Sequence, residues 1–117
     1  MTQKEKQLLL KDLCGRLPYG FTLYRESDDC IITIKSNDIS IFAHFLEYSE
    51  SEDFKPYLRS LSSMTEEERE TYKMFFNEEG LLNTSVDIYL DWLLENHFDY
   101  RSLIKKGLAL EAPEGMY

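Results

Sequence analysis

The residues best suited to chemistry lie close together at positions 97–101, where a histidine, an aspartate, a tyrosine and an arginine occur within one short segment. A histidine beside a carboxylate can act as a general base or a metal ligand, because its pKa lies near neutrality. The spacing of His97 and Asp99 matches no metal-binding motif. A simpler interpretation makes Asp99 a helix cap and Arg101 a partner for a carboxylate or a backbone carbonyl. We therefore predict no catalytic residue, no metal site and no cofactor.

The other polar residues form no recognisable catalytic or ligand-binding motif. His44, the second histidine, falls in a predicted strand beside Phe42, where packing is its ordinary role. Asp87, Asp91 and Glu95 repeat every four residues, which places them on one helix face and indicates a solvated surface. The five glycines are scattered and match no phosphate-binding loop, and no serine lies in a nucleophile elbow.

Charge is the strongest global feature, since 22 Asp/Glu against 13 Lys/Arg give a net charge of −9. The excess is concentrated in residues 26–99, which carry eighteen acidic and five basic side chains. This segment repels phosphate backbones, which disfavours direct nucleic-acid binding and would attract a basic protein partner. The same charge also serves simply to keep a protein surface solvated.

Nothing in the sequence predicts secretion or membrane insertion. There is no run of about 18 apolar residues, and the apolar stretch near the start is too short for a signal peptide. Cys14 and Cys30 are the two cysteines; they make no disulfide framework and lack metal-ligand spacing. We expect a cytoplasmic protein that does not contact a membrane.

An amphipathic helix is predicted over residues 3–16, because Leu9, Leu13 and Cys14 recur at helical spacing. Cys14 is therefore expected to be a small core residue rather than a reactive thiol. Pro18 lies just beyond the helix and ends it.

Three strands are predicted to follow, at about 21–25, 30–36 and 39–46, with a tight turn at 37–38 joining the last two. Alternation places one side-chain set toward the core and the other set on the opposite face. That opposite face is apolar enough to be partly covered by a helix or to serve as a contact surface. The residues predicted to contact a partner there are Ile31, Phe42, His44, Glu47 and Glu50.

The remainder is predicted to be mainly helical. Residues 54–59 are expected to be extended or to form one helical turn. A helix is expected to begin near Thr65, where either Thr65 with Glu68 or Ser63 with Glu66 fits a capping box, and Gly80 is expected to end it. Further predicted segments are a helix over 85–97 with Val86 in its buried stripe, a short helix over 100–106 capped by Asp99, and an irregular tail over 108–117.

These elements predict one α+β domain spanning residues 1–117, with no repeat or linker dividing it. The expected architecture is a small antiparallel three-stranded β-meander, flanked by an N-terminal helix and two to three C-terminal helices.

Several stretches of the chain, taken jointly, resemble a known group of proteins. The segments that carry the resemblance are 8–20, 55–59, 62–68, 91–93, 96–104 and 107–113. They are similar to a family of small proteins encoded by gut anaerobic bacteria and by their phages and mobile elements. That family has no established activity, so the resemblance implies an accessory role and no catalytic residues. The strands at 21–50 depart most from the family pattern.

The sequence thus favours a non-enzymatic, acidic protein-interaction protein with a protein partner whose identity is open, and the resemblance adds phage origin as an expectation. One alternative is a small hydrolase, either metal-dependent or acid/base, that uses His97 and Asp99. A second alternative is an acidic inhibitor that mimics nucleic acid and blocks a DNA-binding protein. Homo-oligomerisation through the sheet or the aromatic-rich helices also remains open.

Overall fold

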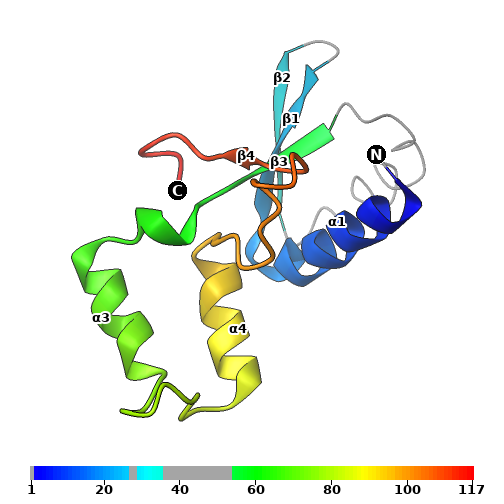
Figure 1. The fold of residues 1–117 in the computed structure, drawn as a ribbon. Coiled ribbons are helices and arrows are strands. Elements are labelled where there is room, and N and C mark those ends of the chain that lie inside the picture. The colour runs from blue at the N-terminus through cyan, green and yellow to red at the C-terminus, as the bar shows by residue number, and fades with distance from the viewer. Residues whose placement is uncertain (1, 27–28, 36–53) are drawn as a thin grey trace.

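A computed structural model describes residues 2–26, 29–35 and 54–117 (Figure 1). The chain is an α+β protein with a helix at its N-terminal end and further helices after the strands, as predicted. The elements are α1 (Gln3–Arg16), the 3-10 turn η1 (Leu17–Tyr19), β1 (Phe21–Arg25), β2 (Cys30–Ile34), β3 (Phe54–Leu58), the 3-10 turn η3 (Leu61–Ser63), α3 (Glu66–Met74), α4 (Val86–Glu95) and β4 (Leu110–Glu111).

The sheet has four strands in the order β2-β1-β3-β4, which corrects the predicted three-stranded antiparallel meander. β1 pairs antiparallel with both β2 and β3, whereas β4 runs parallel to β3. β4 forms in the tail that was predicted to be irregular, because Leu108 and Ala109 are buried and bring the chain against β3. The Ala112 N–H then donates to the Leu58 carbonyl at 2.7 Å. The predicted strand at 39–46 and its turn lie outside the described residues.

The main core lies between α1 and one face of the sheet. Alternation in β2 buries Ile34 and leaves Ile31 on the opposite face, 57% exposed. The buried members of this core are Leu9, Leu13, Phe21, Leu23, Ile34, Leu58, Leu103, Leu108 and Ala109. The prediction that Cys14 is a core residue is wrong, since Cys14 is exposed. Asp12 and Arg16 occupy the buried face of α1 beside Leu9 and Leu13 and rotate Cys14 outward.

Helices α3 and α4 form a hairpin that projects away from the sheet (Figure 1). Thr65 caps α3 in the predicted capping box with Glu68, and the Ser85 hydroxyl caps α4 by accepting the Ile88 N–H. α3 ends at Met74, six residues before the Gly80 that was predicted to end it. The loop between the helices turns earlier because the Asn77 side chain accepts two backbone N–H groups, from Glu79 and Leu81.

A second core of aromatic rings holds the hairpin together. The Phe75 ring lies 5.7 Å from that of Tyr89 and 5.5 Å from that of Trp92, and both contacts are edge-to-face. Tyr72 of α3 and Phe76, just beyond its end, add further ring contacts to the same residues of α4. Such pairs stabilise beyond their buried area, so the hairpin carries its own packing.

The segment after α4 forms turns where a short helix over 100–106 was predicted. Ser102 has a φ of +60°, which a right-handed helix cannot contain. The Asp99 carboxylate does accept the backbone N–H groups of Leu103, at 2.9 Å, and Ile104, at 3.0 Å. Asp99 therefore caps a turn rather than a helix. Across the described part of the chain, none of the helices has the length and apolar character needed to cross a membrane.

Candidate functional site

His97 and Asp99 are not arranged as a catalytic pair. Both carboxylate oxygens of Asp99 are occupied by backbone N–H groups. The His97 ring stacks on Tyr117, with the ring centroids 3.7 Å apart and the planes 12° from parallel. Burial, reinforced by the positive charges of Arg16 and Arg59, lowers the pKa of His97 to about 4. The imidazole is therefore neutral near pH 7 and packs as an aromatic ring.

Tyr117 secures that arrangement by joining two strands. Its hydroxyl accepts the Thr22 N–H at 3.3 Å and donates to the Tyr57 carbonyl at 2.8 Å. These bonds link β1 to β3 just past their paired residues, Leu23 and Pro56. Tyr117 of the tail thus links β1 to β3, and the His97 ring packs against Tyr117.

In the described part of the chain, the acidic row of Asp87, Asp91 and Glu95 does not form a metal site. Within residues 2–26, 29–35 and 54–117, no three His, Cys, Asp or Glu side chains gather closely enough to hold a metal ion. Asp87, Asp91 and Glu95 are all exposed on α4, as expected for a solvated face.

A hollow of about 730 Å³ lies between the start of α3, the end of β3 and the tail. Its polar lining includes Glu67, Glu111 and Glu114, together with the ion pair of Arg59 and Glu68. That pair is bidentate, with Arg59 Nη1 and Nη2 donating to Glu68 Oε2 and Oε1 at 2.8 and 2.6 Å. Because Glu68 neutralises Arg59, the hollow carries uncompensated negative charge.

Replacing Glu68 by glutamine is expected to lower the free energy of unfolding by about 1 kcal/mol at pH 7. The hydrogen bonds from Arg59, aided by those of the capping box, lower the pKa of Glu68 from 4.5 to about 2. A depressed pKa means that the carboxylate stabilises the fold above pH 4.5 and that this contribution is lost as the pH falls toward 2. Urea denaturation of both proteins at several pH values measures the effect, and the difference should shrink across that window.

Glu66→Gln is the matched control, because Glu66 is exposed in the same first turn and has no described ion pair. It should cost only a few tenths of a kcal/mol through the helix dipole. A Glu68→Gln deficit that stays constant from pH 7 to pH 2 would contradict the assigned role of the ion pair.

The largest exposed apolar side chains of the hairpin gather where its two helices are joined. Met74, Leu81, Val86 and Ile88 have exposed fractions of 76, 60, 58 and 56%. They come from the end of α3, the connecting loop and the first turn of α4. We call these four residues the apolar tip. Single exposed apolar residues are ordinary, and four of them within the segment 74–88 make this end of the hairpin the candidate contact surface.

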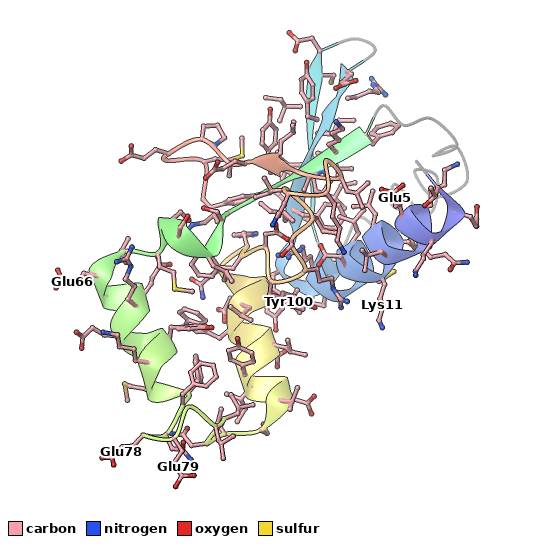
Figure 2. All side chains as sticks on the ribbon, viewed as in Figure 1. Glu5, Lys11, Glu66, Glu78, Glu79 and Tyr100 are labelled. Carbon is pink, nitrogen blue, oxygen red and sulfur yellow. The ribbon has the colours of Figure 1, made fainter. Side chains whose placement is uncertain are left out.

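Acidic residues are interspersed in the sequence with those of the apolar tip. Residues 74–88 contain Glu78, Glu79 and Asp87 and no lysine or arginine. Figure 2 shows Glu78 and Glu79 at the far end of the hairpin, pointing away from the protein, and Glu66 at the opposite end of α3. The whole hairpin, residues 66–95, carries nine acidic and two basic residues. This end of the hairpin therefore combines exposed apolar side chains with an excess of negative charge.

Sequence reasoning missed the apolar tip and selected a different surface. Of the predicted contact residues, Ile31 is exposed on β2, and Phe42, His44, Glu47 and Glu50 lie outside the described residues, so that surface stays a prediction. Val86 was predicted to be buried but is exposed, because the rings of α3 pack on Tyr89 and Trp92, further along α4. The available signal was the presence of Leu81, Val86 and Ile88 among the polar residues of 81–88, outside the aromatic stripe.

Comparison with known proteins adds no relative: no family model, curated protein or solved structure matches this chain. The assignment of the candidate site therefore depends on the geometry of this structure alone.

Proposed function

We propose that this chain is a non-enzymatic interaction protein that binds a protein partner through the apolar tip of the α3–α4 hairpin. The observation that supports the proposal is the exposure of Met74, Leu81, Val86 and Ile88 on a hairpin whose own core is already packed. Because the aromatic rings hold the two helices together, the tip residues are not needed to stabilise the hairpin. Exposed apolar area costs solubility, and a binding partner would cover it.

The polar residues support binding rather than catalysis. The His97 imidazole is stacked on a tyrosine, and the Asp99 carboxylate holds a turn. Each of the two residues that an acid/base hydrolase would use therefore has a packing or capping role. An accessory role, as in the family that the chain resembles, is consistent with a small binding protein.

Site-specific photo-crosslinking tests the proposal. A benzophenone amino acid placed at Leu81 in the producing cells is expected to form a covalent adduct with a protein partner. The same amino acid at Lys105, which is exposed but outside the hairpin, should not form that adduct. The Leu81 adduct should disappear when Met74 and Ile88 are both replaced by serine. An adduct formed equally at both positions, or one unaffected by the serine substitutions, contradicts the proposal.

A further inference from the structure

We infer that the segment bound by the apolar tip is basic and amphipathic, combining lysine or arginine side chains with an apolar stripe. The inference rests on the proposed function, because it names the class of partner for the same surface. It is carried by the arrangement of charge around the exposed apolar residues.

The loop and the first turn of α4, two of the three parts of the tip, place carboxylates close in sequence to exposed apolar side chains. Asp87 lies between Val86 and Ile88 in the first turn of α4, and all three side chains are exposed. In the loop, Glu78 and Glu79 precede Leu81 by three and two residues. A partner that covers the apolar side chains must therefore approach these carboxylates closely.

The carboxylates at the tip have no described ion pair with a basic side chain. The ion pairs of the described residues involve Asp12, Glu26 and Glu68, none of which lies at the tip. An apolar partner without cations would take three carboxylates out of water and leave them unpaired, at a cost in free energy. A partner carrying lysine or arginine would pair with them and gain affinity and association rate.

The same charges argue against two other occupants. Two copies of this chain that met tip to tip would bring three carboxylates from each copy together, which opposes dimerisation through this surface. An anionic lipid surface or a nucleic-acid backbone would be repelled for the same reason. A basic amphipathic helix, whose apolar residues recur at helical spacing, offers apolar side chains to the tip and cations to its carboxylates.

The test uses three fluorescent synthetic peptides of about 18 residues with the same leucine stripe. Their polar faces carry lysine, glutamine or glutamate. Fluorescence anisotropy with the full chain is expected to show binding of the lysine peptide at least about tenfold tighter than that of the glutamine peptide, and the weakest binding for the glutamate peptide. Raising NaCl from about 50 to about 300 mM should weaken the binding of the lysine peptide more than that of the other two peptides.

Matched charge variants locate the interaction. Glu78→Gln/Glu79→Gln/Asp87→Asn removes three charges at the tip and is expected to lower the affinity for the lysine peptide about tenfold. Glu66→Gln/Glu67→Gln/Glu114→Gln removes the same charge from the other end of α3 and the tail, and should change the affinity less than about twofold. Leu81→Ser/Ile88→Ser should also weaken binding about tenfold, since it removes the apolar contact.

Each contrary result has a defined meaning. Equal affinity for the three peptides, or binding of none, overturns the basic partner, while the crosslink at Leu81 still decides the proposed function. Equal losses from the two triple charge variants overturn the tip as the basic-segment site. Unchanged affinity in Leu81→Ser/Ile88→Ser also overturns the inference, because it would indicate a purely electrostatic surface, as expected of a nucleic-acid mimic.

Discussion

Asp12→Ala is expected to destabilise the protein by about 3–5 kcal/mol, because it removes the carboxylate that pairs with two arginines in a buried cluster of charges. Asp12 and Arg16 are both fully buried in α1, and Arg16 Nε donates to Asp12 Oδ2 at 2.7 Å. Arg101 Nε lies 3.3 Å from Asp12 Oδ1. Without the carboxylate, two guanidinium groups would remain close together and Arg16 would keep only its bond to a backbone carbonyl.

Urea unfolding of wild type and Asp12→Ala, followed by circular dichroism, measures this loss. Lys11→Ala is the control, since Lys11 is exposed on the same helix (Figure 2) and should change stability by no more than about 0.5 kcal/mol. The double variant Asp12→Ala/Arg16→Met should lose less stability than the sum of the single variants, because neither of the two fully buried charges is then left without the other. A loss below about 1 kcal/mol for Asp12→Ala would show that water reaches the cluster.

The cluster also shows why local sequence patterns predicted only part of this protein. Asp12 and Arg16 are four residues apart on a helix, which is the spacing of an ordinary exposed ion pair. Their burial depends on Arg101 and on the Phe98 carbonyl, which accepts from Arg16 Nη2 at 2.7 Å. These partners are more than 80 positions away in the chain. Nothing near Asp12 in the sequence indicates that such a contact exists.

Sequence patterns contained within a few residues predicted several elements of the structure. The bounds of the helix at 3–16 and the strand at 21–25 agree with the structure, as does the capping box that begins α3. Helix capping and side-chain periodicity are local properties, so a short window of sequence is enough to find them. The α+β class followed from these elements.

Features that depend on contacts between residues far apart in the chain were not predicted from the sequence. β4 has only two residues, Leu110 and Glu111, and exists because β3 offers an edge for parallel pairing. A two-residue strand has no periodicity to detect, and Pro113 nearby suggested an irregular tail. The apolar tip was missed for a related reason. Whether Val86 is buried depends on which residues of α4 the rings of α3 contact, and that packing is not visible in either helix alone.

Phe98→Ala is the second substitution with a large expected effect, a loss of about 3–5 kcal/mol of stability. The Phe98 ring is fully buried, 5.5 Å from the Trp92 ring and 4.4 Å from the Arg59 guanidinium carbon. Its backbone carbonyl accepts from Arg16 of α1, and its N–H donates to Leu93 of α4. Phe98 thus joins the aromatic core of the hairpin to the first helix.

Trp92 is the single tryptophan of the chain, so its fluorescence reports on the hairpin core, while far-UV circular dichroism reports on all elements. Denaturation of Phe98→Ala should shift both signals to lower urea concentration by the same amount. Phe98→Leu retains most of the apolar contact and should lose about half as much or less. Met74→Ala, at the exposed tip, should lose no more than about 0.5 kcal/mol.

Coincident transitions would mean that the hairpin and the sheet core unfold as one cooperative unit. This coupling matters for binding, because a tip held rigidly by a shared core presents its apolar side chains without first having to order them. If Phe98→Ala shifts the Trp92 signal but leaves the circular dichroism transition in place, the hairpin unfolds separately. The Phe98 ring would then stabilise the hairpin alone, and the Arg16 bond to its carbonyl would be too weak to couple the two cores.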